Sequence, residues 1–163
     1  MPILKWLLIL LFVLVIGSIG AGQAGLLSGS APTDLGAHGG KLNPPSATDN
    51  SVSSQASLYP GNPQAASAQI APLPLRGDGP MTIARIKAVV EAMAGAKVVR
   101  SDADYLYAEY TTRLMKFVDD VEFWYDPVAK AIQVRSASRI GKGDMGVNRN
   151  RIEAVRAALA ASP

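Results

Sequence analysis

The sequence predicts an α+β fold, in which a four-stranded antiparallel sheet carries two helices on one face (α-β-β-β-β-α) and an N-terminal hydrophobic helix precedes the domain. Three observations lead to this class. A charge-free apolar run opens the chain. Four runs with alternating apolar and polar residues follow one another through short links. Segments with helical apolar spacing stand before and after these runs, which suits two helices covering one sheet face.

The first 27 residues are expected to be a transmembrane anchor or a signal peptide. Lys5 precedes the run WLLILLFVLVIGSIGAG, and residues 6–33 carry no charged side chain. The strongly apolar stretch 6–16 resembles a signal-peptide core with a cleavage site after Ala24, whereas extension through Leu27 is long enough to span a bilayer. Lys5 favours a cytoplasmic N-terminus. We therefore expect the inner membrane with an exported, periplasmic domain, or a secreted protein if the segment is cleaved.

Residues 28–67 are expected to form a tether that is partly packed on the domain. The segment is rich in Pro, Gly, Ser, Ala and Asn and lacks apolar periodicity. Such a composition buries too little apolar surface to offset the entropy of ordering the chain. The following stretch, 68–75, suits an edge strand or an extended segment lying on the domain, which we place at residues 68–163.

Two helices are expected within the domain. The first opens near Pro80, a residue favoured in the first helical turn, and stops at Gly95. The second starts near Asn148, which we expect to cap it. Each helix has one apolar stripe, comprising Ile83, Ile86, Val89, Val90 and Met93 in the first and Ile152, Val155 and Leu159 in the second.

Four β-like runs occupy residues 97–101, 105–113, 116–125 and 131–138. Because the links are short, neighbouring strands should be antiparallel. Alternation puts Leu106, Phe123 and Val134 on the helix-covered face and Tyr105, Tyr107 and Trp124 on the other. We expect these three aromatic residues to be exposed, either to dock a partner or to stabilise the sheet through cross-strand pairs.

Composition excludes several kinds of site. The chain has no cysteine, so disulfides, thiol nucleophiles and thiolate metal sites are absent. Its single histidine, His38, makes a histidine zinc site or a Ser-His-Asp triad improbable. The net charge of +3 is too small for the extended basic face that nucleic-acid binding needs. We expect no metal, no cofactor, no catalytic residue and no nucleic-acid partner.

The strongest candidate for a binding site is the basic, Gly-rich loop that leads into the last helix. Free amides at a helix N-terminus favour an anion, and nearby arginines add charge-assisted hydrogen bonds. The site would bind a small anion, a lipid head group or another envelope protein. In the alternative, Asp144 pairs with Arg139 or Arg149 and merely pins the loop to the sheet. The candidate residues are Arg139, Lys142, Asp144, Asn148, Arg149 and Arg151.

Asp119 and Asp120 are secondary candidates. Adjacent strand residues point to opposite faces, so the two carboxylates should not act as a pair. A small hydrolase or transferase would use one of them as a base near the arginine loop. Weighed against this enzyme and against a purely structural protein, we favour an exported, membrane-tethered, non-enzymatic binding module associated with the envelope.

Several segments resemble the domain of unknown function 1499 family, whose members are small bacterial and chloroplast proteins that are commonly exported or membrane-tethered. The resemblance covers about residues 32–156, with its most specific parts in FVDDVEF, RSASRIG and DMGVNRNRIE, at 117–123, 135–141 and 144–153. It implies location and fold rather than a reaction, and it implies that residues 50–55 pack on the domain. Many members carry cysteines near Pro44 and at Ser51, and any role of those cysteines is absent here.

Overall fold

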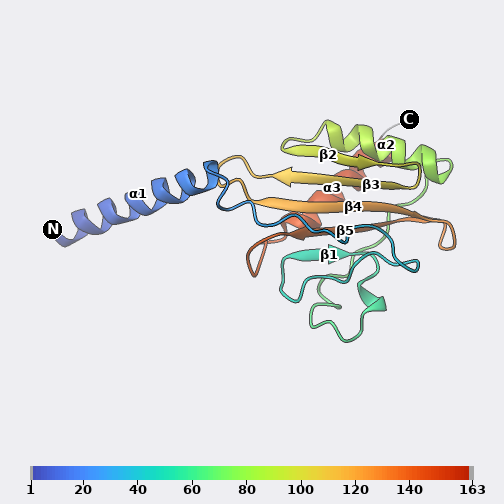
Figure 1. The fold of residues 1–163 in the computed structure, drawn as a ribbon, viewed down its shortest axis with the longest axis horizontal. Helices are drawn as coiled ribbons and strands as arrows, with labels where there is room; N and C mark the ends of the chain where they lie inside the picture. The colour runs from blue at the N-terminus through green and yellow to red at the C-terminus, as the bar shows by residue number, and fades with distance from the viewer. Residues whose placement is uncertain (1, 162–163) are drawn as a thin grey trace.

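A computed structural model describes residues 2–161 and contains a five-stranded antiparallel sheet in the order β1-β5-β4-β3-β2 (Figure 1). The predicted α+β class and the apolar N-terminal helix are confirmed, but the prediction of four strands is wrong. The elements are α1 (Pro2–Gln23), β1 (Ser51–Ser53), the 3-10 turn η1 (Ala56–Leu58), α2 (Gly79–Glu91), β2 (Ala96–Ser101), β3 (Tyr105–Thr111), β4 (Val118–Asp126), β5 (Ala131–Ser138) and α3 (Val147–Ala161).

The additional strand, β1, lies at the edge of the sheet beside β5. Ser51 is opposite Ala137 and Ser53 is opposite Arg135. Farther along the same edge, Leu73 forms an isolated antiparallel bridge with Ile132. With three residues and a single apolar side chain, β1 is too short to show the alternation by which strands are found in a sequence.

Helices α2 and α3 cover one face of the sheet and form the main core with it. Asp78 caps α2 by accepting a hydrogen bond from the Met81 amide at 2.7 Å. Alternation along β3, β4 and β5 turns Leu106, Phe123 and Val134 toward the helices, as predicted. The fully or nearly fully buried apolar side chains of the two helices are Ile83, Ile86, Val90, Ile152, Val155 and Leu159.

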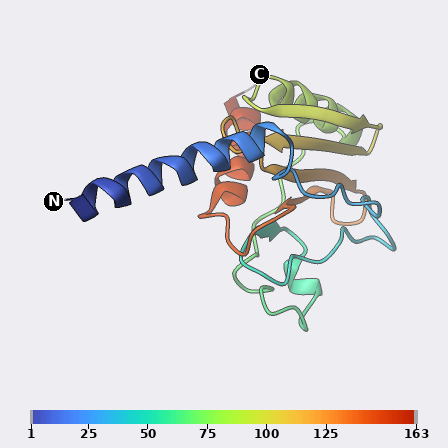
Figure 2. The ribbon, with the colours of Figure 1, turned by 60° about the vertical axis from the view of Figure 1, so that its left-hand side comes forward.

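The opposite face of the sheet is covered by the segment that follows α1, residues 24–45, called here the covering segment. This segment crosses β4 and β5 on the side away from α3 (Figures 1 and 2). Leu42 is fully buried there against Tyr105 and Tyr107, which are only 4% and 8% exposed. The prediction of exposed aromatic residues is therefore wrong for both tyrosines. Trp124 packs partly buried against the same cluster.

Polar side chains hold this covering segment in place. The Leu42 amide donates to Gln55 Oε1 at 2.8 Å, and Gln55 Nε2 donates to the Gly40 carbonyl at 3.1 Å. Tyr59 donates its hydroxyl to the Leu42 carbonyl. Asn62 Nδ2 donates to the Pro45 carbonyl at 2.7 Å. A Pro/Gly/Ser-rich stretch is thus ordered mainly by side-chain bonds to its backbone, which apolar periodicity does not report.

Glu122 lies fully buried beneath the covering segment. Its Oε1 accepts hydrogen bonds from the Gly36 amide and the Tyr105 hydroxyl, both at 2.8 Å. Its Oε2 has no hydrogen-bond partner among residues 2–161, and Arg135 Nη1 lies 3.6 Å away. Burial raises the pKa of Glu122, and the positive charge of Arg135 offsets this only in part.

We predict that Leu42→Ala lowers the free energy of unfolding by about 2–5 kcal/mol, because it leaves a cavity between the covering segment and the sheet. The control is Leu58→Ala, which truncates a side chain that is 45% exposed and should cost less. Urea unfolding of the full-length protein in detergent measures both. Equal losses would mean that the covering segment does not unfold together with the sheet.

We also predict that Glu122 makes the free energy of unfolding decrease as pH rises. Above its ordinary pKa of 4.5, folded Glu122 keeps a proton that the unfolded chain has released. Its stabilising contribution is therefore complete below that pH and is lost as pH rises through the folded-state pKa. The urea midpoints of the wild type and of Glu122→Gln are measured between about pH 4 and about pH 8. The amount by which the wild-type midpoint exceeds that of the variant should decrease as the pH rises. A flat difference, matching that of exposed Glu91→Gln, would contradict the prediction.

Candidate functional site

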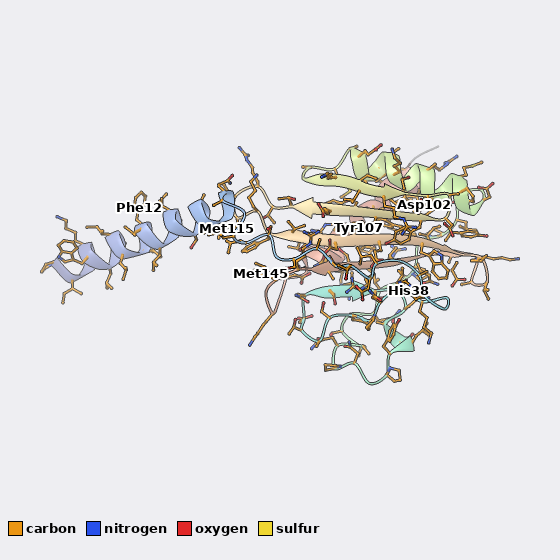
Figure 3. The ribbon with its side chains drawn as sticks, in the orientation of Figure 1. Phe12, His38, Asp102, Tyr107, Met115 and Met145 are labelled. Carbon is orange, nitrogen blue, oxygen red and sulfur yellow. The ribbon has the colours of Figure 1, made fainter. Side chains whose placement is uncertain are left out.

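Three of the candidate residues, Arg139, Lys142 and Asp144, lie at the α1-proximal end of the domain, defined here as the β3–β4 turn (residues 112–117) and the β5–α3 loop (residues 139–146). The other candidates lie in β4 and near the start of α3. The end of α1 contacts this region. Gln23 Nε2 donates to the Leu114 carbonyl at 2.9 Å. Gly22 is buried so closely against Met115 that a Cβ at residue 22 would overlap its backbone. Figure 3 shows Met115 beside the end of α1 and Met145 at the same end of the domain.

Arg139 lies in an ion-pair cluster on the face beneath the covering segment. Its Nε donates to both carboxylate oxygens of Asp120, at 3.1 and 3.0 Å, and its Nη2 donates to Glu109 Oε1 at 2.5 Å. The Tyr107 hydroxyl completes the cluster by donating to Asp120 Oδ1 at 2.6 Å. The hydrogen bond to Asp120 raises the pKa of Arg139. Burial, more than the bond to Asp120, raises the pKa of Tyr107. With its side chain 7% exposed, Arg139 has little surface left for an external ligand.

Arg151 forms the corresponding cluster on the helix-covered face. Its Nη2 lies 2.5 Å from Asp119 Oδ2, and its Nη1 donates to Asn148 Oδ1 at 2.6 Å. The guanidinium carbon lies 4.6 Å from the centre of the Tyr110 ring. Burial raises the pKa of Tyr110 to about 12, although Arg151 acts to lower it. Asp119 and Asp120 thus point to opposite faces, and each pairs with its own arginine.

Asp144 occupies the helix N-terminus that the sequence offered to an external anion. Its carboxylate accepts hydrogen bonds from the Gly146 and Asn148 amides, both at 2.9 Å. Partial burial would raise the pKa of Asp144, but the hydrogen bonds from Asn148 and Gly146 outweigh it and lower the pKa. The expectation that Asn148 caps the helix is wrong. Asn148 lies inside α3, is fully buried, and donates to the Asn50 carbonyl and to Ser138 Oγ.

Arg149 and Lys142 differ in their surroundings. Arg149 Nη2 donates to the carbonyls of Ser67 and Gln69, at 2.8 and 3.0 Å, and so fastens the extended segment to α3. Lys142 is exposed and makes no ion pair within residues 2–161. Of the six predicted binding residues, Lys142 is therefore the cation most open to an external partner.

A groove that the sequence did not indicate lies beside these clusters. Its volume is about 940 Å³, and it runs between the end of α2, the end of β3 and the start of α3. The β3–β4 turn contributes exposed Arg113 and half-buried Lys116. The remaining lining includes Met93, Ala94, Tyr110, Val147, Asn150 and Arg151. A smaller apolar cavity of about 330 Å³ lies between the β3–β4 turn and the β5–α3 loop.

The described residues offer little for metal chemistry. Within 2–161, His, Asp and Glu side chains form no group of three or more that could hold a metal ion.

The signal for the groove in the sequence was Arg113 and Lys116 on either side of Leu114 and Met115. From the sequence, these residues predict only a turn between two strands. The groove could not be predicted because α2 and α3, which form its other walls, lie in distant parts of the chain.

We predict that Arg139→Ala lowers the free energy of unfolding by about 3–5 kcal/mol, because it leaves Asp120 and Glu109 without their shared cation. Lys87→Ala, which breaks the exposed helical pair with Glu91, is the control and should cost about 0.5 kcal/mol. Arg139→Lys should recover only part of the loss, since lysine lacks the planar fork. An Arg139→Ala variant as stable as Lys87→Ala would instead identify Arg139 as a residue available for ligands.

Comparison with known proteins identifies a family for this chain. A family model described as a protein of unknown function (DUF1499) matches residues 41–159. The match includes all six candidate residues of the basic loop, both aspartates of β4 and the whole sheet. No curated protein and no solved structure matches the chain. The resemblance seen in the sequence is thus confirmed, and the chain belongs to the DUF1499 family of proteins of unknown function.

Proposed function

We propose that the protein is a single-span membrane protein whose α+β domain acts on the exported side as a non-enzymatic binding module. Helix α1 has 22 residues and is apolar and exposed over most of its length. At 1.5 Å per residue it is about 33 Å long, which suits a hydrocarbon core of about 30 Å. Lys5 near its start favours a cytoplasmic N-terminus and hence an exported domain.

The observation that carries the proposal is the docking of α1 on the domain. Gly22 packs against Met115, and Gln23 bonds to the β3–β4 turn. A spanning α1 would reach the bilayer surface near these residues, since they are its last two. The β3–β4 turn and the groove beside it would then lie at the level of the lipid head groups. This position favours a ligand that comes from the membrane.

The groove favours an amphiphilic anion, meaning a molecule with an acidic group and an apolar body. Apolar surface comes from Met93, Tyr110 and Val147, and positive charge comes from Arg113 and Lys116. Its volume lies within the range usual for small-molecule sites. An acidic lipid head group with part of its acyl chain has this chemistry. The basic loop is the less favoured site, because its arginines already bind carboxylates and carbonyls of the protein.

The alternative of a hydrolase or transferase has less support. Asp119 and Asp120 are each bound to an arginine, so neither resembles the free, poised base that such an enzyme needs. The matched part of the chain contains no histidine and no cysteine that could activate a nucleophile or serve as one. A binding role requires neither.

The anchor is tested with the full-length protein carrying a C-terminal tag. We expect it to stay in the membrane after carbonate extraction, to keep the mass of the uncleaved chain, and to lose its domain to protease added from the exported side. Release of a shortened chain beginning near Gly25 would show a cleaved signal and overturn the anchor. Protection from that protease would overturn the orientation.

The groove is tested by thermal unfolding of the same protein in detergent with a short-chain phosphatidylglycerol. At about ten times its Kd, a ligand of the folded state should raise Tm by about 3–6 °C. Arg113→Glu should abolish the shift. Arg76→Glu should retain it, because Arg76 is exposed and closely follows Leu73, which bridges to Ile132 at the opposite end of the sheet. An equal shift with phosphatidylcholine would exclude recognition of the acidic group. No shift with either lipid would overturn the groove as a lipid site.

A further inference from the structure

Both loops of the α1-proximal end expose a large apolar side chain. Leu114, in the β3–β4 turn, is 58% exposed, and Met145, in the β5–α3 loop, is fully exposed. The two loops flank the place where α1 leaves the domain (Figures 2 and 3). At the opposite end of the sheet, Val128 in the β4–β5 turn is similarly exposed at 93% and provides a natural comparison.

The backbone holds Met145 in this exposed position. Its φ angle is +52°, a value uncommon for a residue other than glycine. The carboxylate of Asp144, the preceding residue, accepts hydrogen bonds from the Gly146 and Asn148 amides and so fixes the turn that contains Met145. The outward direction of the Met145 side chain is thus set by the cap of α3.

Positive charge surrounds these apolar side chains. Arg113 and Lys116 flank the tip of the β3–β4 turn, and Lys142 lies in the loop of Met145. None of the three makes an ion pair with the residues that the structure describes. Exposed apolar side chains bordered by lysine and arginine are the composition of surfaces that bind anionic membranes.

We infer that the α1-proximal end is a membrane-contact surface, in which Leu114 and Met145 insert among the head groups while Lys142, Arg113 and Lys116 bind anionic lipid phosphates. The inference rests on the proposed anchoring by α1. The bond from Gln23 to the Leu114 carbonyl, 2.9 Å long, keeps the turn next to the end of a spanning helix. The surface is therefore assigned to the leaflet from which α1 emerges.

The absence of cysteine allows a direct test with single labels on the full-length protein. Phe12→Cys, Leu114→Cys, Met145→Cys and Val128→Cys each carry an environment-sensitive fluorophore. The protein is reconstituted in vesicles of phosphatidylcholine and phosphatidylglycerol that contain two quencher lipids. One carries a shallow quencher, which reports positions 114, 145 and 128, and the other carries a quencher at the bilayer centre, which reports position 12 at the middle of α1. We expect quenching and blue-shifted emission at positions 12, 114 and 145, and neither at position 128.

The charge contribution is tested in the Met145→Cys background by adding Lys142→Glu. Each cation near an anionic surface favours contact by about fivefold, so the ratio of lipid-contacting to free label should fall by at least that factor. Arg76→Glu, at the far end of the sheet, is the matched control and should leave the ratio unchanged. High salt and pure phosphatidylcholine should reduce quenching at position 145 but not at position 12.

The outcomes separate the anchor from the contact surface. An unquenched label at position 12 would overturn the anchor and the inference together. Quenching at position 12, with positions 114 and 145 behaving like position 128, would overturn the inference alone. Disulfide crosslinking of two unlabelled Met145→Cys molecules, without lipid quenching of the labelled variant, would assign the surface to a second copy and also overturn it. If quenching at position 145 were the same with and without anionic lipid, the role given to Lys142 would be overturned.

Discussion

Two adjacent carboxylates in β4 bind arginines on opposite faces of the sheet, and the remaining structure depends on this pairing. Asp119 binds Arg151 of α3, and Asp120 binds Arg139 at the end of β5. Because successive side chains of a strand point to opposite faces, these two adjacent aspartates form one ion pair on each face of the sheet. All four side chains are nearly buried, so the loss of one partner would strand a charge away from water. β4 is the central strand of the sheet, which makes it the natural place for this junction.

The same pairing explains why the basic loop is a weaker candidate for ligand binding than its sequence suggests. An arginine-rich, glycine-rich turn before a helix has the donors that an anion needs. Here Asp144 supplies the anion at the helix N-terminus, and backbone carbonyls of the extended segment satisfy Arg149. The loop therefore stabilises the fold from within. Lys142 and the cations of the β3–β4 turn are left for contacts outside the domain.

Much of the fold could be predicted because the spacing of apolar residues in the sequence shows which side of each helix and strand is buried between the sheet and the two helices. α2, α3 and β2–β5 lie close to their expected ranges, and Leu106, Phe123 and Val134 face the helices as alternation requires. The second layer could not be predicted in this way. It is held by Gln55, Tyr59 and Asn62 bonding to backbone groups, and such bonds leave no repeat in the sequence. The opposite orientations of Asp119 and Asp120 followed from alternation, whereas their arginine partners and the groove depend on contacts between distant segments.

The contact of Gly22 and Gln23 with the β3–β4 turn has a mechanical consequence. A membrane helix that is joined to its domain by a flexible linker can tilt without moving the domain. In this protein the last residues of α1 pack directly against the domain. Bilayers of different thickness change the tilt of a spanning helix. If α1 spans the membrane, its tilt is transmitted to the sheet, and the mouth of the groove rises or sinks relative to the head groups. The thickness of the surrounding bilayer would then control how readily lipid reaches the groove.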